Sequence, residues 1–406
     1  MSSSTPLKKR RWFLKLVLQV EKVYDAFHRC LARLTGRLGK PMVAEIYHAI
    51  RHESGVSIKG RALLARTWPH PSVDDPALVN LYHMLRRWCT PERPYSLIQF
   101  SAGGETVPVR ADREGYFEVE LELENAPSDE LLIELPESEV SPSATWPIAR
   151  PASQPHCVIL SDVDDTVLVT HAGKILSMIA TTLLGNALTR QLFPGVVELY
   201  KHLRTGPDAS SGHRNPLAYV TSSPYNLHGL LELIFNENGL PLGPFFMTDW
   251  GLDEDKWLKR SHRDHKIDAI RRILSWYPGK PAIFLGDTSL VDAPIYIEAA
   301  LEHPDRVAMI LIHKVSNPKR IAMFEAEAAK LDGHPTAIHF FSDYAEAAAL
   351  LAAAGWISEE QRDAVAAVIS EDLPSLADRV VQRFTEESPN DSTPSDEKSG
   401  PPGNGG

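Results

Sequence analysis

Beyond residue 157, short apolar segments with the length of strands alternate with segments that have helical periodicity. The expected strands cover 157–161, 217–221, 282–286, 306–313 and 337–342, and the expected helices cover 195–204, 264–275 and 344–354. Such alternation is typical of α/β domains in which helices cover both faces of a parallel sheet. Active sites of these folds lie beyond the carboxyl ends of the strands, so functional side chains are expected there.

Three aspartates follow the first of these strands within four positions. Asp162 and Asp164 are two positions apart, and such residues point to the same side of an extended segment. Crowded carboxylates repel one another and lose hydration, which favours a bound cation or a reaction at this point. One carboxylate could act as nucleophile and the other as proton carrier, with Mg²⁺ between them and a phosphate. A polar turn after a buried strand is the alternative interpretation of this motif alone.

Two further strand ends and one helix start carry groups that suit the same chemistry. They are Thr221-Ser222-Ser223, Gly286-Asp287 with Asp292, and Lys266. Hydroxyl and backbone N–H groups can hold phosphate oxygens, an acid beside a glycine can approach a cation, and a lysine can neutralise a phosphoryl oxygen. Singly, they could be a strand exit, a tight turn and a surface lysine. Their order along a parallel sheet favours a phosphoryl-transfer site.

These motifs resemble the four-motif signature of the haloacid dehalogenase superfamily of aspartate-nucleophile phosphatases. The signature here is Asp162-x-Asp164-x-Thr166, Thr221, Lys266 and Gly286-Asp287-x-x-x-x-Asp292. The flanking residues are similar to the catalytic domain of the actin-patch-associated phosphatidate phosphatases, over roughly residues 155–355. The resemblance implies a Rossmann-like sheet of the haloacid dehalogenase type.

The resemblance also implies a role for each motif residue. Asp162 would form an aspartyl-phosphate, while Asp164 would protonate the leaving alkoxide and then activate water. The phosphoryl oxygens would be held by Thr166, Lys266 and either Thr221 or Ser222. The Mg²⁺ ligands would be Asp162, Asp164 (through its backbone carbonyl), Asp287 and Asp292.

The other half of the chain divides by composition into four segments. Residues 1–45 predict a basic amphipathic helix, which suits an anionic membrane surface or, alternatively, packing on the next domain. Residues 55–136 predict a small antiparallel β domain that could form a sandwich, with a hairpin at 103–104 and alternating apolar and acidic residues over 116–123. A linker is expected over 137–156, before a phosphatase domain over 157–370, and a disordered tail over 386–406.

Charge and cysteine content limit the partners and the compartment. The formal net charge of -11 argues against a nucleic acid partner for the whole molecule. Three widely spaced cysteines form neither a disulfide framework nor a zinc site, which favours a reducing compartment. No apolar run is long enough to span a membrane and no signal peptide pattern is present. We therefore expect a cytoplasmic protein, which could bind a membrane peripherally.

The sequence thus predicts a Mg²⁺-dependent phosphatase that hydrolyses phosphatidate to diacylglycerol and phosphate. Space for a large cap is lacking over 172–193 and 224–263, which implies an open site suited to a phosphate on a large body, such as a phospholipid at a membrane surface. Two alternatives are a phosphatase of the same mechanism acting on a phosphoprotein or another phosphoester, and a non-catalytic membrane-associated adaptor.

Overall fold

A computed structural model gives the fold of the chain. It describes residues 41–52, 55–64, 92–102, 105–121, 130–138, 144–148, 155–169, 192–208, 210, 214–248 and 262–370. The segment predicted as a basic helix, up to residue 40, and the predicted disordered tail lie outside these residues. So do most of 172–193 and part of 224–263, where a cap would lie.

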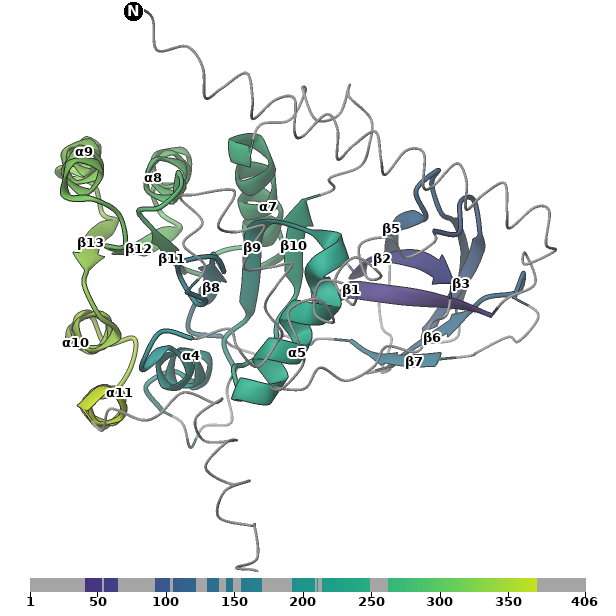
Figure 1. Cartoon of the computed structure of the whole chain (residues 1–406), viewed down its shortest axis with the longest axis horizontal. Coiled ribbons are helices and arrows are strands. Elements are labelled where there is room, and N and C mark those ends of the chain that lie inside the picture. Colours follow the sequence, from purple (N-terminus) through teal and green to yellow (C-terminus); the bar gives the residue numbers. More distant parts are fainter. Residues whose placement is uncertain are drawn as a thin grey trace, which may run out of the picture.

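Six parallel strands form the central sheet, as the alternating pattern predicts (Figure 1). They are β8 (Val158–Ser161), β9 (Leu217–Pro224), β10 (Phe245–Thr248), β11 (Ala282–Asp287), β12 (Val307–His313) and β13 (Ala337–Phe341). Their order in the sheet is β10-β9-β8-β11-β12-β13. The chain therefore builds outward in one direction from β8 and then in the other from β11, as in doubly wound folds. The carboxyl ends of β8 and β11 flank the crevice where ligands bind in such sheets.

Helices cover both faces of the sheet, and each face has its own apolar core. One face is covered by α4 (Val196–Thr205), α5 (His228–Asn238), α10 (Tyr344–Ala353) and α11 (Glu359–Ser370). The other is covered by α7 (His262–Trp276), α8 (Asp292–Glu302) and α9 (Pro318–Ala328). Two short 3₁₀ turns, η3 (Tyr225–Leu227) and η4 (Ala329–Leu331), continue β9 and α9. Five elements were not predicted from the sequence: α5, β10, α8, α9 and α11.

The N-terminal half contains two antiparallel sheets that enclose a third apolar core, which confirms the expected β domain and makes it a sandwich. One sheet has β1 (Met42–His52), β2 (Gly55–Leu64) and β5 (Tyr116–Leu121). The other has β3 (Leu97–Ala102), β4 (Glu105–Arg110), β6 (Glu130–Glu134) and β7 (Ala144–Pro147). The predicted hairpin is the β3–β4 pair, in which Phe100 lies opposite Val107.

Two segment boundaries predicted from the sequence differ from the structure. Strand β1 begins at Met42, so residues 42–45 are not part of the predicted basic helix. Pro41 precedes this strand, and proline neither continues a helix nor lets the residue before it stay helical. Strand β7 lies inside the segment predicted as a linker and pairs with β6. Its four residues form a strand because they pair with β6, and the local composition of the segment does not indicate that pairing.

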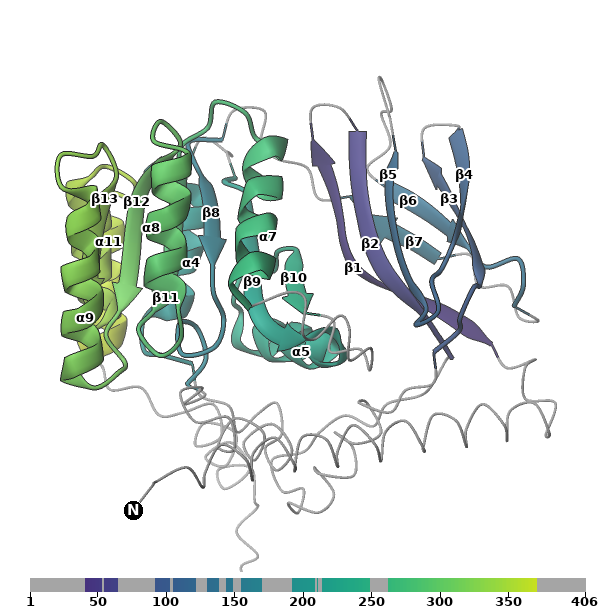
Figure 2. The ribbon, with the colours of Figure 1, turned by 90° about the horizontal axis from the view of Figure 1, so that it is seen from above.

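The sheet β1-β2-β5 is covered on both faces (Figure 2). One face packs on the sandwich core, and the other faces the parallel sheet across α7 and the end of β9. Tyr47 of β1 stacks on Tyr225 with 4.2 Å between ring centroids. Glu120 on the acidic side of β5 accepts a 2.6 Å hydrogen bond from Arg272 of α7. The acidic residues that alternate along this strand therefore join the two halves of the molecule.

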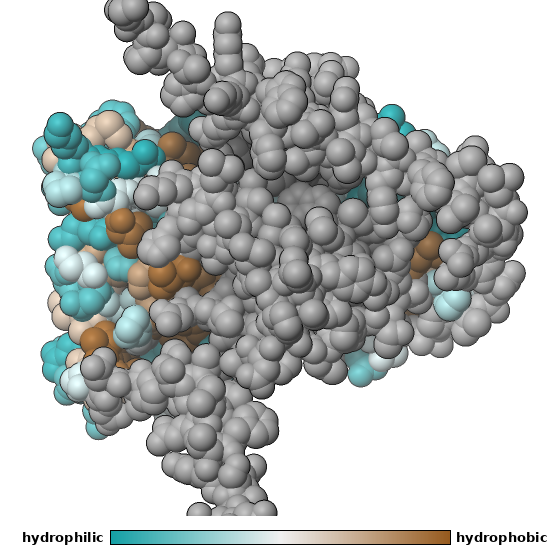
Figure 3. Space-filling model, viewed as in Figure 1, coloured by the Kyte–Doolittle hydropathy of each residue, from teal (hydrophilic) through white to brown (hydrophobic). Residues whose placement is uncertain are grey.

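In the described residues, the helices lack the length and apolar content needed to cross a membrane. Along α9, β13 and α10 the outer surface mixes hydrophilic and hydrophobic side chains (Figure 3). Helix α9 buries Phe324 and exposes most of its other residues, as expected for the outermost helix of one layer.

Candidate active site

A tight turn after β8 brings the first two aspartates to the crevice. The Val167 N–H donates to the Val163 carbonyl at 2.9 Å, and the Asp165 N–H donates to the Leu168 carbonyl at 2.8 Å. Asp165 has φ of 59°, a left-handed conformation that aspartate tolerates better than most residues. The turn thus reverses the chain while Asp162 and Asp164 stay at the strand end, both buried.

Lys266 lies between two of the predicted site carboxylates. Its ammonium donates to Asp162 Oδ1 at 2.6 Å and to Asp292 Oδ1 at 2.5 Å, and all three side chains are buried. Helix α7 positions this lysine in its second turn, while the apolar side of the helix packs on the sheet. Burial alone would lower the pKa of Lys266, but Coulombic attraction to Asp162 and Asp292 outweighs burial and raises it. The lysine is therefore a fixed positive charge beside Asp162.

The β11–α8 loop requires a glycine next to its first acid. A Cβ atom on Gly286 would lie 2.8 Å from the Cβ of Asp292 and 2.7 Å from the ring of Tyr296, closer than side chains pack. Asp287 ends β11, and Asp292 begins α8, where the positive end of the helix dipole favours a carboxylate. The Thr166 hydroxyl donates to Asp287 Oδ2 at 3.3 Å, so this predicted phosphate ligand contacts a neighbouring acid in the structure.

Two hydroxyl groups of β9 hold the side chain of Asp164. Thr221 Oγ1 donates to Asp164 Oδ2 at 3.0 Å, and Ser223 Oγ donates to the same oxygen at 2.8 Å. Side chains alternate along a strand, so Ser222 faces the other side of β9 and is not part of this set. The sequence placed all three hydroxyls of Thr221, Ser222 and Ser223 at this strand end, but it predicted a phosphate-binding role only for Thr221 or Ser222. Strand periodicity could have identified Ser223 if β9 had been extended to Pro224.

The site buries more carboxyl groups than cationic groups. Four buried carboxylates face the single buried ammonium of Lys266 among the described site residues: Asp162, Asp164, Asp287 and Asp292. Burial and then the charge of Asp292 raise the pKa of Asp287 to about 8. Burial and Asp292 also raise the pKa of Asp162, while Lys266 opposes that shift. A cation would remove much of this electrostatic cost.

The arrangement fits a hard divalent cation. One carboxylate oxygen each from Asp162, Asp287 and Asp292 lies within 4.8 Å of the other two. Asp162 Oδ2 is buried, and no hydrogen-bond donor reaches it from the described residues. Carboxylate oxygens are the donors that Mg²⁺ prefers, and a buried acceptor without a partner is costly unless a ligand contacts it. The side chain of Asp164 is outside this cluster, because its carboxylate binds the β9 hydroxyls.

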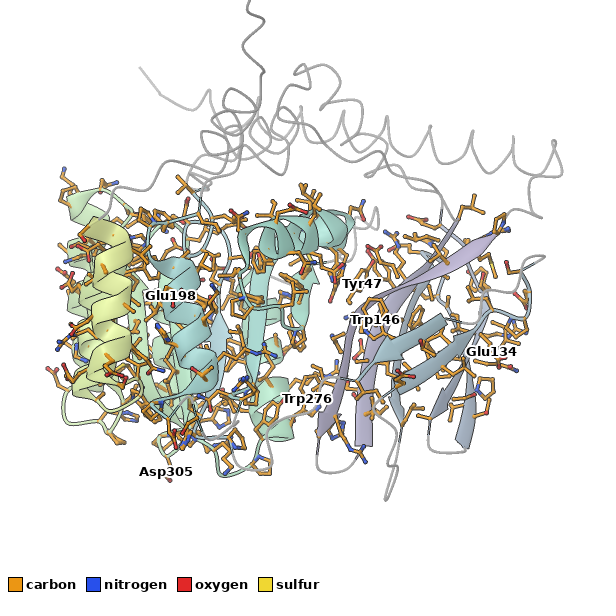
Figure 4. The ribbon with its side chains drawn as sticks, turned by 90° about the horizontal axis from the view of Figure 1, so that it is seen from below. Tyr47, Glu134, Trp146, Glu198, Trp276 and Asp305 are labelled. Carbon is orange, nitrogen blue, oxygen red and sulfur yellow. The ribbon has the colours of Figure 1, made fainter. Side chains whose placement is uncertain are left out.

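A cavity of about 210 Å³ lies elsewhere, at the junction of the two halves. Its walls include Val158, Pro216 and Leu217, which are at the amino ends of β8 and β9. Trp146 and Trp276, two other lining residues, come from the sandwich and from the end of α7 (Figure 4). The acids lie at the opposite, carboxyl edge of the sheet, so this cavity is separate from the candidate active site.

Comparison with known families agrees with this geometry. Residues 157–314 match the family described as "Phosphatidate phosphatase APP1, catalytic domain". The chain is also 29% identical over 160 residues to "Phosphatidate phosphatase APP1" of Saccharomyces cerevisiae. The aligned region covers 39% of this chain and 26% of the yeast protein. The match thus spans about a quarter of the yeast protein's length. The predicted resemblance to this catalytic domain is confirmed, and the matched region includes every site residue described above.

A solved structure shares a weak likeness with the chain. It is described as "Crystal structure of XAC1771, a novel carbohydrate acetylesterase from Xanthomonas citri". The comparison has a TM-score of 0.29 and 12% identity, and it covers 81% of this chain and 73% of the other. A TM-score this low does not establish a common fold.

Proposed function

We propose that the chain is a Mg²⁺-dependent phosphoric monoester hydrolase that forms an aspartyl-phosphate on Asp162, and that its substrate is phosphatidate. The observation that carries the proposal is the buried Asp162–Lys266–Asp292 group at the crevice of the sheet, within the residues that match a phosphatidate phosphatase catalytic domain. A buried ion group seldom improves stability over apolar packing, so a reaction is the better explanation for it.

In the first step, Asp162 Oδ2 attacks phosphorus and the bond from phosphorus to the ester oxygen breaks. Lys266 holds the other oxygen of Asp162 and so fixes the direction of attack. Asp164 gives its proton to the leaving alkoxide, while its own Oδ2 stays held by Thr221 and Ser223. Among the described residues no hydrogen bond is found to Asp164 Oδ1, which is the oxygen available for proton transfer.

In the second step, water attacks phosphorus and the aspartyl-phosphate bond breaks. Asp164, now ionised, accepts the proton of the water, so phosphate leaves and Asp162 returns to its starting state. Asp162, Asp287 and Asp292 would hold Mg²⁺, together with the backbone carbonyl of Asp164. The ion would supply positive charge against the phosphoryl oxygens. Thr166, Thr221 and Lys266 remain the proposed phosphate-binding residues, and the alternation of side chains along β9 favours Thr221 over Ser222.

The lipid substrate is supported by the printed name of the yeast relative and by the basic amphipathic segment expected before β1. A cytoplasmic protein that binds the membrane peripherally fits the same proposal. An adaptor without activity is the weaker alternative. Burying four carboxyl groups at one edge of the sheet costs free energy, and a scaffold has no use for them.

A substrate panel tests this function. With Mg²⁺ present, we expect phosphate release from phosphatidate in mixed micelles to exceed release from a phosphopeptide by about 100-fold or more in kcat/KM, because differences of this size follow from a few kcal/mol of selective binding. Chelation of the metal should abolish release from every substrate. Faster hydrolysis of the phosphopeptide would identify the protein-phosphatase alternative, and release from no substrate would favour the adaptor.

The protonation of Asp287 makes the stabilising effect of Mg²⁺ depend on pH. Aspartate in an unfolded chain ionises near pH 4, whereas burial and Asp292 raise the pKa of folded Asp287 to about 8. Between these values the folded state binds more protons, so the metal-free protein loses stability as the pH rises. Mg²⁺ binds the ionised form and must displace the proton at lower pH.

We therefore expect Mg²⁺ to raise Tm more at about pH 8.5 than at about pH 6, measured by calorimetry at matched ionic strength. At a Mg²⁺ concentration of a hundred times Kd, binding raises the free energy of unfolding by about 2.7 kcal/mol. For a domain of this size, that corresponds to a rise in Tm of roughly 5–10 °C. Asp287→Asn should weaken the pH dependence of the gain, because the raised pKa of Asp162 leaves a second proton for Mg²⁺ to displace. An equal Tm rise at both pH values in the unaltered protein would contradict the role of Asp287 as a ligand.

A further inference from the structure

The exit of β9 is held by the sandwich rather than by the parallel sheet alone. Tyr225, the second residue after Ser223, is buried and stacks on Tyr47 of β1. Asn226 accepts a 2.9 Å hydrogen bond from Arg61 Nη1, although the two residues are 165 positions apart in the chain. Strands β1 and β2 therefore contact the turn η3, where the chain leaves the carboxyl edge of the parallel sheet.

Arg61 is itself fixed within the sandwich. Its Nε donates to the Glu114 carbonyl at 2.9 Å, its Nη2 pairs with Glu92 at 2.5 Å, and its guanidinium lies 4.2 Å from the ring centroid of Tyr116. The side chain is 8% exposed, so little water supports the charge. A planar guanidinium can serve three acceptors at fixed angles, which an ammonium cannot do. Arg61 thus fixes the position of Asn226 relative to the sandwich.

The residues just before η3 are the ones that orient Asp164. Thr221 and Ser223 both donate to Asp164 Oδ2, and the Ser223 N–H donates to Thr221 Oγ1 at 3.0 Å. Pro224 follows Ser223 and restricts the backbone at this point. A displacement of η3 would therefore move the two hydroxyls relative to the carboxylate that they hold.

We propose that Arg61 is a positioning residue for proton transfer by Asp164, acting through Asn226 and the end of β9. The inference rests on the proposed function, in which Asp164 protonates the leaving alkoxide. A buried arginine is poor evidence of stability, because apolar packing at the same place would cost less desolvation. Its three fixed partners and its contact with η3 instead favour a role in setting geometry.

The dependence of the rate on the leaving group separates this role from a structural one. A short-chain, soluble phosphatidate releases an alkoxide that needs a proton, whereas p-nitrophenyl phosphate releases a stable anion that does not. The value of kcat/KM reports formation of the phospho-enzyme and excludes its later hydrolysis. Misplacement of Asp164 therefore lowers kcat/KM for the first substrate much more than for the second.

We expect Arg61→Lys to lower kcat/KM for the short-chain phosphatidate by about 10–100-fold, and that for p-nitrophenyl phosphate by less than about 3-fold. Asn226→Ala should give the same split without altering the charge in the sandwich. Asp164→Asn removes the proton donor itself, so it gives the largest difference between the losses of kcat/KM on the two substrates. Glu120→Gln is the matched control, because it alters another contact between the two halves and leaves η3 alone; both rates should stay unchanged.

Equal losses on both substrates in Arg61→Lys and Asn226→Ala, or no loss in either, would overturn the positioning role. These results leave the proposed function intact as long as Asp162→Asn is inactive. If instead Asp162→Asn retains turnover, the proposed function itself is wrong. Thermal unfolding of each variant shows whether a loss reflects the folded fraction, since unfolding lowers both rates together.

Discussion

Asp162→Asn is expected to reduce phosphate release by at least about 10⁴-fold, because losing the attacking group of a covalent mechanism is among the largest single-residue effects known. Asparagine keeps the shape of the side chain and its acceptor for Lys266, but its amide nitrogen cannot attack phosphorus. The change removes one of the carboxylates around the buried ammonium, and Asp292 still pairs with Lys266. The fold and part of the Mg²⁺ binding should therefore survive.

Phosphate release and acid-quench trapping of labelled phospho-enzyme measure this effect in two ways. The unaltered protein should retain label from the substrate, and Asp162→Asn should retain none. Asp305→Asn is a suitable control, since Asp305 (labelled in Figure 4) is an exposed aspartate just before β12, at the amino edge of the sheet, whereas the site lies at the carboxyl edge. Activity of Asp162→Asn within about tenfold of the unaltered protein would show that another group is the nucleophile.

Lys266→Met is expected to lower the free energy of unfolding by about 3–5 kcal/mol and to abolish turnover. Methionine fills much of the same space, so the loss comes from charge rather than from packing. Without the ammonium, Asp162 and Asp292 lose the cation that contacts both of them, at 2.6 and 2.5 Å. Urea unfolding in the presence of chelator measures the change directly.

A second substitution separates the electrostatic cause from a packing defect. In Lys266→Met with Asp292→Asn, one uncompensated charge is gone, so much of the lost stability should return while activity stays absent. Lys330→Met is the matched control, because the Lys330 side chain is 56% exposed and its ion pair with Glu327 contributes little. Unaltered stability of Lys266→Met would mean that the acids are neutral in the folded state.

The grouping of the candidate site residues at one edge of the sheet was predictable because its information is local. Each strand of the parallel sheet that carries a site residue is a short apolar run, and each of Asp162, Thr221 and Asp287 stands at the end of such a run. Parallel strands align their carboxyl ends, so the order of motifs in sequence is enough to place these groups together. Lys266 was predictable for the same reason, since it lies one helical turn into α7.

The missed features depend on contacts between distant segments. Ser223 could be assigned only by knowing that β9 continues past residue 221, and the extra residues are held by β10. The role of Arg61 has no local sign at all, because an arginine on a strand is ordinarily a solvated side chain. Its partner Asn226 lies in a segment that resembles the family, but no residue there indicates a partner 165 positions away.

The sheet β1-β2-β5 shows that the boundary of a sequence family need not be the boundary of a folding unit. The family match begins at residue 157, yet Tyr47 belongs to the apolar core under α4 and α5, and Ile50 to the core under α7. In a chain that began at residue 157, the part of each core that Tyr47 or Ile50 covers would be exposed to water. The strands of this sheet thus hold no proposed reacting group, yet they complete the interior on which the parallel sheet depends.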